Sequence, residues 1–295
     1  MKYLYYPGCS LEGTAIEYNR STQALMKLFG VDLLELEGWN CCGASAAESI
    51  SYLLSMVLPA RNLAIAEKAV KDMDIKNEIL VPCSACYLNL KKVEIKIRSQ
   101  PELLKKINTV LNEEELHLHG NIKVRHLLDV IITDFGPEAI LPRVKRKFKD
   151  FLIAPYYGCQ CLRPYIIFDD PEAPRSMEPL IEAVGAKVFD WAMGGKCCGA
   201  SLMNTKKEVG MELTTAILKQ AKGADAIITV CPMCQMNLDA YQNNISKRCG
   251  ENIRISVLYL PQLLGLAMGL SKKQVGLDLN LTVTQEVKAI FNHYC

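Results

Sequence analysis

The pentapeptide Cys-Cys-Gly-Ala-Ser occurs twice in this chain, within "NCCGAS" at residues 40–45 and within "KCCGAS" at residues 196–201. The two copies are separated by about half of the 295 residues. The sequences before and after each copy also correspond, segment by segment. A repeat that extends over both halves indicates that the chain consists of two related domains.

Each half contains the same series of segments around its copy of the pentapeptide. A short apolar stretch ends in Gly-Cys, a helical and a second apolar stretch lead to the double cysteine, and a longer helical region leads to a third apolar stretch that ends in a C-x-x-C motif. The corresponding segments are 2–10 and 151–160, 28–45 and 183–201, and 78–90 and 226–238, with a weaker match between 123–131 and 257–265. Pro59 is expected to kink or break the longer helical region of the first half.

Apolar strands that alternate with helices are typical of a parallel sheet covered by helices. The sequence therefore predicts an α/β fold with two tandem, pseudo-symmetric Rossmann-like domains, residues 1–145 and 146–295. The cysteine loops are expected at the C-terminal ends of the strands. The basic residues 141–150 are expected to form a solvated linker rather than a nucleic-acid patch, and the tail after Lys272 is expected to form a C-terminal arm.

The composition is that of a globular protein with a sizeable core and little net charge. Half of the residues are hydrophobic and the formal net charge is +2, which argues against nucleic acid as the main partner. The first residues lack the features of a signal peptide, and no apolar stretch approaches the length of about 20 residues that a membrane span requires. We therefore expect a cytoplasmic protein with no membrane span, whose 13 cysteines do not form a disulfide framework.

Ten of the 13 cysteines belong to a duplicated set of five. These sets are Cys9, Cys41, Cys42, Cys83 and Cys86 in the first half, and Cys159, Cys197, Cys198, Cys231 and Cys234 in the second. Since the carboxyl ends of parallel strands meet at one edge of a sheet, we expect each set to converge on one site. A helix that begins at each C-x-x-C motif would favour the thiolate over the thiol there.

Five thiolates in one place favour an iron–sulfur cluster over other uses of cysteine. A structural zinc ion takes four tetrahedral ligands and has no use for a fifth thiolate. An ordinary cubane cluster also takes four cysteines. A cluster offers several iron atoms, however, so adjacent cysteines can bind different ones, and a fifth ligand suggests an opened cluster. Zinc binding, thiol-only redox chemistry and thiols without a metal stay as alternatives.

The paired C…CCG…C-x-x-C pattern resembles the cysteine-rich CCG domain. Its duplication over essentially the whole chain is similar to the B subunit of the heterodisulfide reductases of methanogenic archaea. This resemblance implies reduction of the mixed disulfide of coenzyme M and coenzyme B to two thiols. It also implies two noncubane [4Fe–4S] clusters, one on each set of five cysteines. Related CCG proteins serve succinate:quinone, glycolate and lactate oxidoreductases, and an electron-transfer subunit of the succinate:quinone type is the alternative interpretation.

The electrons are expected to come from another protein. The sequence contains neither a G-x-G-x-x-G motif for a dinucleotide nor a ferredoxin-type cysteine run. The resemblance implies the iron–sulfur C subunit and the flavin-containing A subunit of heterodisulfide reductase as partners, with a hydrogenase or a formate dehydrogenase. As a mechanism, we expect two clusters to flank the disulfide, each delivering one electron and capturing one sulfur.

Four other residues are candidates for roles near the cysteines. Lys196 and Arg163 lie close to the second set in sequence and are candidate cations for the anionic groups of the implied substrate. Trp39 and Trp191 precede the two CCG loops and are expected either to shield the clusters from water or to pack in the core.

The remaining cysteines and the histidines are expected to have no role in the chemistry. Cys161 lies two residues after Cys159, but Gly158 precedes Cys159 as Gly8 precedes Cys9, so we expect Cys159 to be the ligand. Spare buried or surface thiols are expected at Cys249 and Cys295, and Cys161 is given no role. None of the four histidines is next to a cysteine motif: His117, His119, His126 and His293. We expect His117 and His119 to be solvated rather than catalytic.

Overall fold

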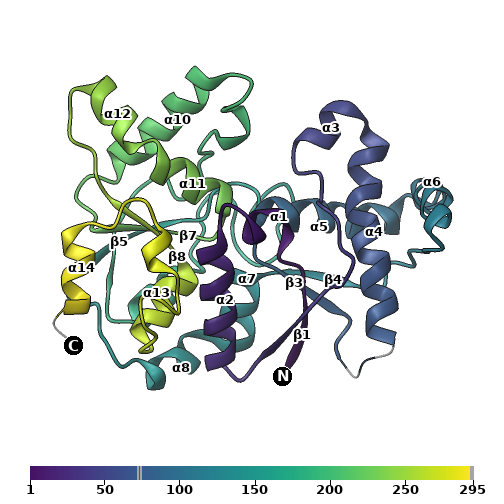
Figure 1. Cartoon of the computed structure of the whole chain (residues 1–295), viewed down its shortest axis with the longest axis horizontal. Helices are drawn as coiled ribbons and strands as arrows, with labels where there is room; N and C mark the ends of the chain where they lie inside the picture. The colour runs from purple at the N-terminus through teal and green to yellow at the C-terminus, as the bar shows by residue number, and fades with distance from the viewer. Residues whose placement is uncertain (72, 74, 293–295) are drawn as a thin grey trace.

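Each half of the chain forms one four-stranded parallel sheet with helices on its faces (Figure 1). The computed structural model describes residues 1–71, 73 and 75–292. The first sheet has the order β2-β1-β3-β4 and the second the order β6-β5-β7-β8. The strands are β1 (Lys2–Tyr5), β2 (Asp32–Glu35), β3 (Glu78–Val81), β4 (Lys123–His126), β5 (Leu152–Tyr156), β6 (Lys187–Val188), β7 (Ala226–Thr229) and β8 (Ser256–Tyr259). The predicted α/β fold of two Rossmann-like domains is confirmed.

The two sheets are built on the same pattern of buried strands. The central strands β3 and β7 are apolar and almost fully buried, as expected of parallel strands that are covered on both faces. The edge strands β2 and β6 are more exposed. In both sheets the first strand of the half lies between the edge strand and the strand that leads to C-x-x-C. The two cysteine sets therefore start from equivalent places.

Helices connect the strands and cover both sheets. In the first half they are α1 (Gly8–Glu12), α2 (Ile16–Leu28), α3 (Ala46–Ile50), α4 (Tyr52–Lys71), α5 (Ser84–Ser99), α6 (Pro101–Leu111), α7 (Leu127–Val130), the π-helical η2 (Ile131–Phe135) and α8 (Gly136–Ile140). In the second half they are α9 (Glu178–Ala183), α10 (Lys207–Gln220), α11 (Pro232–Ala240), α12 (Gln242–Cys249), α13 (Leu260–Ala267) and α14 (Gln285–Asn292). Short 3₁₀ turns are η1 (Asn112–Glu114), η3 (Leu141–Arg143), η4 (Ala200–Leu202) and η5 (Leu277–Leu279).

The break in the long helical region of the first half lies at Ser51 and not at Pro59. Ser51 is extended and separates α3 from α4. Pro59 is buried inside α4, which continues through it. Because α4 packs along α5, this tertiary contact outweighs the backbone hydrogen bond that a proline cannot donate. The prediction of a break at Pro59 was wrong in its position.

Each half has one strand more than predicted, and one predicted helix is a loop. β4 and β8 were recognised only as the start of a weak match, since four residues that run directly into a helix give little periodicity. The stretch that follows Cys159 was expected to be helical, but residues 160–177 form an irregular loop before α9. Three prolines lie in this loop, and the Asp169 carboxylate accepts the backbone N–H groups of Arg175 and Ser176. Both features favour turns over a helix.

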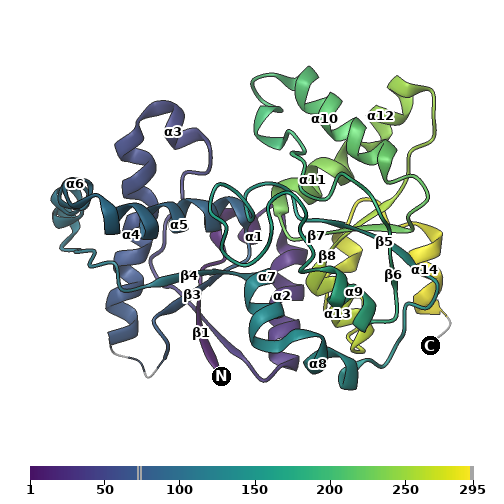
Figure 2. The same ribbon diagram turned by 180° about the vertical axis from the view of Figure 1, so that it is seen from behind.

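The two halves pack together through equivalent helices (Figure 2). α2, which lies between β1 and β2, contacts α13, which follows β8. α9, which lies between β5 and β6, contacts α8, which lies in the connection after β4. The connection that contains residues 141–150 is anchored to the second half, because the backbone N–H groups of Lys145 and Arg146 donate to the Ala267 carbonyl. The domain boundary between residues 145 and 146 stays a prediction.

The segment after Lys272 packs against the body of the protein over its described residues. Gly276 lies against Glu17 of α2, and the backbone N–H groups of Leu281 and Thr282 donate to the Asp239 carboxylate at 2.9 Å each. The expected C-terminal arm is therefore attached to both halves up to α14. Within the described ranges, every helix is too short or too polar to span a membrane.

Candidate functional site

The ten cysteines of the two sets lie at the C-terminal ends of the strands. Cys9 lies in α1 after β1, the pair Cys41–Cys42 lies in the loop after β2, and Cys83 and Cys86 are at the start of α5 after β3. The second half repeats this placement after β5, β6 and β7. In Figures 1 and 2, α1, α5 and α11 lie together in the middle of the molecule, between α3 and α10. The fold thus brings three separate segments of each half to one place.

The sulfur atoms within each set are close to one another. The Sγ atoms of Cys9 and Cys41 are 3.7 Å apart, and those of Cys42 and Cys86 are 3.4 Å apart. In the second half, the Sγ atoms of Cys198 and Cys234 are 3.6 Å apart. Further thiol contacts join Cys159 to Cys197 and Cys231 to Cys234.

A glycine without a side chain allows this close approach in both halves. Gly8 and Gly158 both have a φ of +71°, a conformation that glycine adopts far more easily than other residues. A Cβ atom would lie 2.8 Å from the Cys86 Sγ if added to Gly8, and 3.0 Å from the Cys234 Sγ if added to Gly158. The Gly-Cys of each half therefore provides backbone space for the sulfur of the last cysteine.

An asparagine fastens the CCG loop to the C-x-x-C helix in each half. The Asn89 side-chain amide donates to the carbonyls of Cys42 at 3.2 Å and of Ala44 at 2.9 Å. Asn237 donates to the Cys198 carbonyl at 2.8 Å. Both asparagines stand three residues after the last cysteine of their set. The structure shows that it fixes the position of the double cysteine.

A tyrosine donates to the carbonyl directly before each double cysteine, and a tryptophan packs against that tyrosine. The Tyr6 hydroxyl donates to the Asn40 carbonyl at 2.8 Å, and the Tyr156 hydroxyl donates to the Lys196 carbonyl at 2.7 Å. Trp39 packs edge-on against Tyr6 and Trp191 packs edge-on against Tyr156, at centroid distances of 5.4 and 6.1 Å. Burial and then the nearby cysteine charges raise the pKa of both tyrosines. The tryptophans thus act on the sites through these tyrosines.

The protonation of the thiols shows what kind of group the sites suit. Hydrogen bonding to Cys41 and Cys86 lowers the pKa of Cys42, whereas hydrogen bonding to Cys42 raises the pKa of Cys41 and Cys86. A hydrogen bond with Cys159 likewise lowers the pKa of Cys197 to about 6. Thiols that share protons in this way cannot all ionise side by side. A cationic metal centre is needed if all five are to be thiolates.

The arrangement suits an iron–sulfur cluster better than a single ion. In the parts of the chain that the structure describes, no three His, Cys, Asp or Glu side chains are arranged to hold one metal ion. Zinc requires four ligands around one point. Five sulfurs that arrive from three segments, with neighbouring pairs 3.4 to 3.7 Å apart, fit a larger object with several metal atoms. The donor set therefore fits the predicted cluster.

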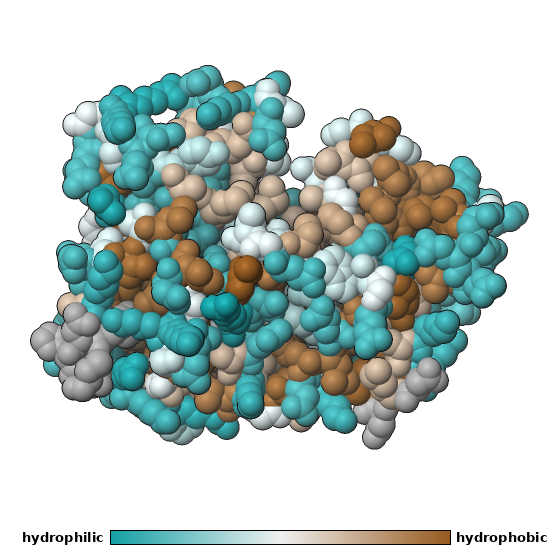
Figure 3. Space-filling view, in the orientation of Figure 1, coloured by the Kyte–Doolittle hydropathy of each residue, from teal (hydrophilic) through white to brown (hydrophobic). Residues whose placement is uncertain are grey.

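One narrow cavity lies at the second site, and Ser45 of the first CCG loop reaches it. It has a volume of about 50 Å³, and residues of the second site line it together with a serine from each pentapeptide, Ser45 and Ser201. Cys9, Cys41 and Cys197 are exposed, whereas the C-x-x-C cysteines are buried. Figure 3 shows a notch between the α10–α12 and α3–α4 lobes, with residues of intermediate hydropathy at its floor. Both sites are therefore adjacent and reach the surface.

The two candidate cations differ in their availability. The Arg163 guanidinium donates to the Gly195 carbonyl and forms an ion pair with Glu172 at 3.1 Å. Hydrogen bonds from Cys159 and the Gly199 amide lower the pKa of Cys197 against the opposing effect of burial, and the charge of Arg163 lowers it further. Lys196 is exposed, and among the described residues no side-chain partner faces its ammonium group. Lys196 is the freer of the two beside the second site.

The other cysteines and histidines lie outside the two sets. Cys161 is buried and its thiol donates to the Tyr157 carbonyl at 3.2 Å, while Cys159 lines the cavity. Cys249 lies at the end of α12. Among the histidines, His119 pairs with Glu67 and His126 is fully buried. Cys295 and His293 lie outside the described residues.

Comparison with known proteins gives the same duplicated pattern. The model of the family described as "Cysteine-rich domain" (CCG) matches residues 3–91 and 153–239. The "8-methylmenaquinol:fumarate reductase membrane anchor subunit" of Wolinella succinogenes is 34% identical over 284 residues, which are 95% of this chain and 96% of that protein. The B subunit of the "Ferredoxin/F(420)H(2)-dependent CoB-CoM heterodisulfide reductase" of Methanosarcina acetivorans is 29% identical over 283 residues, 93% of this chain and 92% of that protein.

A solved structure supports the fold. The "hypothetical protein from Helicobacter pylori" has a TM-score of 0.77 at 18% identity, covering 96% of this chain. This chain spans about half of that one, 52% of its length. Because the family model matches both halves of the present sequence, the chain belongs to the cysteine-rich CCG domain family and carries two copies of that domain.

Proposed function

We propose that this chain belongs to a multi-subunit oxidoreductase, in which it reduces a disulfide to two thiols, and that the disulfide is the mixed one of coenzyme M and coenzyme B. In this proposal, each set of five cysteines holds one noncubane [4Fe–4S] cluster. One observation carries the proposal: the two equivalent five-cysteine sites lie side by side, because Ser84, next to Cys83, donates to the carbonyl of Val230, next to Cys231. A disulfide has two sulfur atoms and takes two electrons, which matches two adjacent sites.

The residues of the chain hold the reacting parts in place. Bound at these sites, iron–sulfur clusters supply one-electron reduction and iron atoms with affinity for sulfur. Asn89 and Asn237 fix the double cysteines relative to the C-x-x-C helices. Gly8 and Gly158 leave space for the sulfurs of the last cysteines. The exposed Cys9, Cys41 and Cys197 mark the side from which a substrate reaches the sites.

The proposal includes partners that supply electrons. They are the iron–sulfur C subunit and the flavin-containing A subunit of heterodisulfide reductase, with a hydrogenase or formate dehydrogenase behind them. Relatives named as the B subunits of ferredoxin-linked heterodisulfide reductases support a multi-subunit complex of this kind. We propose that the chain works in the cytoplasm, as a peripheral subunit.

A second function is favoured by two observations. The relative from the fumarate reductase is 34% identical, against 29% for the relative from the heterodisulfide reductase. The residues that line the cavity at the second site are uncharged apart from any ionised cysteines. The proposed disulfide carries several anionic groups, for which this lining offers no cation. The second candidate is therefore an iron–sulfur subunit that passes electrons in a fumarate or succinate:quinone oxidoreductase.

Two assays on anaerobically purified protein separate these candidates. In the first, chemically reduced protein is mixed with the coenzyme M–coenzyme B disulfide and thiol release is measured. In the second, a menaquinol analogue is added to the oxidised protein and cluster reduction is followed by its absorbance. Thiol release with no response to the quinol supports the disulfide reductase. Cluster reduction by the quinol without thiol release overturns it in favour of the second candidate, and a Cys249→Ser variant controls for thiols outside the two sites.

A further inference from the structure

The Tyr18 hydroxyl contacts both C-x-x-C segments at once. Tyr18 lies on α2 of the first half and is fully buried. Its hydroxyl oxygen is 3.1 Å from the Pro82 carbonyl and 3.1 Å from the Val230 carbonyl. These carbonyls belong to the residues directly before Cys83 and Cys231. A single hydroxyl therefore joins the backbone segments that lead into the two sites.

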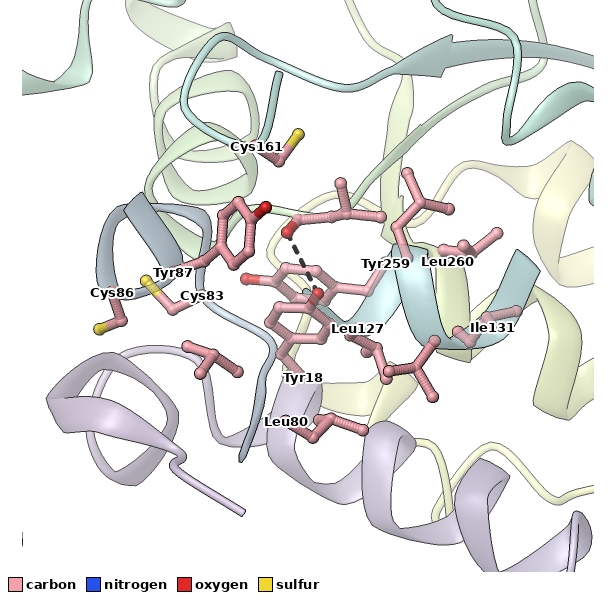
Figure 4. Packing of buried hydrophobic residues seen from close by; sticks show 14 of the residues in the cluster. Tyr18, Leu80, Cys83, Cys86, Tyr87, Leu127, Ile131, Cys161, Tyr259 and Leu260 are labelled. Atoms are coloured by element: carbon pink, nitrogen blue, oxygen red, sulfur yellow. Dashed lines mark hydrogen bonds between the residues drawn. The ribbon is translucent and has the colours of Figure 1, made fainter. Parts of the chain in front are cut away.

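Ser84 provides a second connection between the same segments. Its hydroxyl donates to the Val230 carbonyl at 3.1 Å, and it directly follows Cys83. The route from Cys83 to Cys231 runs through Ser84, across the hydrogen bond from its hydroxyl to the Val230 carbonyl, and from Val230 to Cys231 along the backbone. Figure 4 shows the Tyr18 and Tyr259 rings face to face, with Cys83 to their left and Cys161 above them, beyond Tyr87. The two sites are therefore linked through buried hydrogen bonds between the halves.

The pseudo-symmetry of the molecule isolates the role of these hydroxyls. Tyr18 stacks on Tyr259 with centroids 4.1 Å apart, and at the equivalent place in the other half Phe168 stacks on His126. Phe168 has no hydroxyl, and the residue equivalent to Ser84 is Pro232. Ring stacking is thus present in both halves, but at these two pairs of equivalent positions the hydroxyls that bridge the halves belong to the first half. Packing alone would be satisfied by a phenylalanine at position 18.

We propose that the hydroxyls of Tyr18 and Ser84 form the path by which electrons pass between the two sites. This inference rests on the proposed function, because it requires a cluster in each site. A protein that donates one electron at a time and docks at one place can then serve both sites. The passage oxidises the centre in one site by one electron and reduces the centre in the other by one, and the two O–H bonds stay intact.

The test measures the exchange of one electron between the sites. Full-length wild-type protein, Tyr18→Phe, Ser84→Ala and the double variant are each mixed with one equivalent of titanium(III) citrate and freeze-quenched for electron paramagnetic resonance. Cys9→Ala and Cys159→Ala proteins provide reference spectra for the separate sites. Tyr259→Phe is the matched control, because it removes a hydroxyl from the stacked partner ring, and that hydroxyl contacts Gln235 of the second half without bridging to the first half.

The inference predicts that the double variant reaches the same final distribution of the electron several-fold more slowly than the wild type and Tyr259→Phe. Each single variant gives a smaller delay, which decides the matter if the double variant loses a cluster. Equal rates in proteins with equal iron and sulfide contents would overturn the inference and leave the proposed function intact. A wild type without iron and sulfide would instead overturn the proposed function, and the inference with it.

Discussion

Gly8 and Cys86 are packed so closely that a methyl group on Gly8 would lie 2.8 Å from the cysteine sulfur. Gly8→Ala is therefore expected to lose cluster content at the first site and to destabilise the fold by more than the roughly 1–2 kcal/mol that an alanine costs in left-handed backbone. Iron analysis and urea unfolding measure the two effects. Gly30→Ala is the matched control, because Gly30 has a φ of +72° and open space around it.

Gly30→Ala should lose only the stability that alanine costs in left-handed backbone, and it should keep the wild-type iron content. If Gly8→Ala and Gly30→Ala lose the same stability and hold the same iron, then the close approach to the sulfur has no consequence for the site. Gly158→Ala extends the test to the second half, where a Cβ would lie 3.0 Å from the Cys234 sulfur.

The asparagine that fastens each CCG loop gives a second prediction. Asn89→Ala leaves the Cys42 and Ala44 carbonyls without their side-chain donor, which costs about 1–3 kcal/mol. Asn237→Ala should cost less, because the Cys198 carbonyl keeps the Thr214 hydroxyl as a donor. Each variant should lose iron preferentially from its own site, seen as loss of one of two spectral components. Alanine at the exposed Asn252 is the control. Normal iron content in both clamp variants would show that the loops are held by other contacts.

Much of this site was foreseeable from the repeat. Each cysteine set could be assigned because the cysteines follow apolar stretches in the same order twice, and parallel strands place their carboxyl ends together. The functions of Asn89 and Asn237 were within reach, since the same residue stands at the same offset in both halves. A single chain compared with itself thus supplies part of what an alignment would give.

Other features depend on contacts between distant segments and leave no local pattern. Tyr18 and Val230 are 212 positions apart, so no spacing rule connects them. Ser45 of the first half lines the cavity of the second site, which requires the two halves to be packed together. The loop that follows Cys159 was mistaken for a helix, although its prolines were visible. Repeat symmetry suggested a helix there, and local turn chemistry outweighed it.

His126 makes stability depend on pH. Burial lowers the pKa of His126 to about 4 in the folded protein, against the ordinary value of 6.5 for an exposed histidine. The unfolded chain therefore binds a proton that folded His126 does not, so the free energy of unfolding falls as the pH drops from about 6.5 towards 4. Over that whole window the loss amounts to about 3 kcal/mol. Urea unfolding at several pH values between 5 and 7.5 measures it.

His126→Asn is the variant that isolates this effect. Asparagine keeps an acceptor for the Leu128 N–H, which donates to the His126 ring at 3.1 Å, but it does not titrate. The difference in stability between the wild type and His126→Asn should therefore shift in favour of the variant as the pH falls. Parallel pH curves for the two proteins would contradict the assignment of this pH dependence to His126.

Opposite buried charges distinguish the two otherwise similar sites. Lys91 and Asp239 both lie five residues after the last cysteine of their set, and both are buried. A positive charge near a redox centre stabilises its reduced form and a negative charge destabilises it. Lys91→Met should lower the reduction potential of the first site, and Asp239→Asn should raise that of the second. A redox titration followed by electron paramagnetic resonance measures both shifts.

Arg98→Met controls for the loss of a charge at the surface. Arg98 pairs with the same Glu94 as Lys91, but its side chain is 62% exposed against 3% for Lys91. Solvent should screen its charge, so its removal should move the potential of the first site less. Shifts of equal size for both variants, or no shift for either, would show that the buried charges do not tune the sites.

The central claim is that each half of this chain holds one iron–sulfur cluster on its five cysteines. Iron, zinc and acid-labile sulfide analysis of the anaerobically purified protein tests it most directly. The account predicts about eight iron and eight sulfide per chain, about half of each in Cys42→Ala or Cys198→Ala, and wild-type amounts in Cys249→Ser. About two zinc per chain without sulfide, or no metal at all, would contradict it.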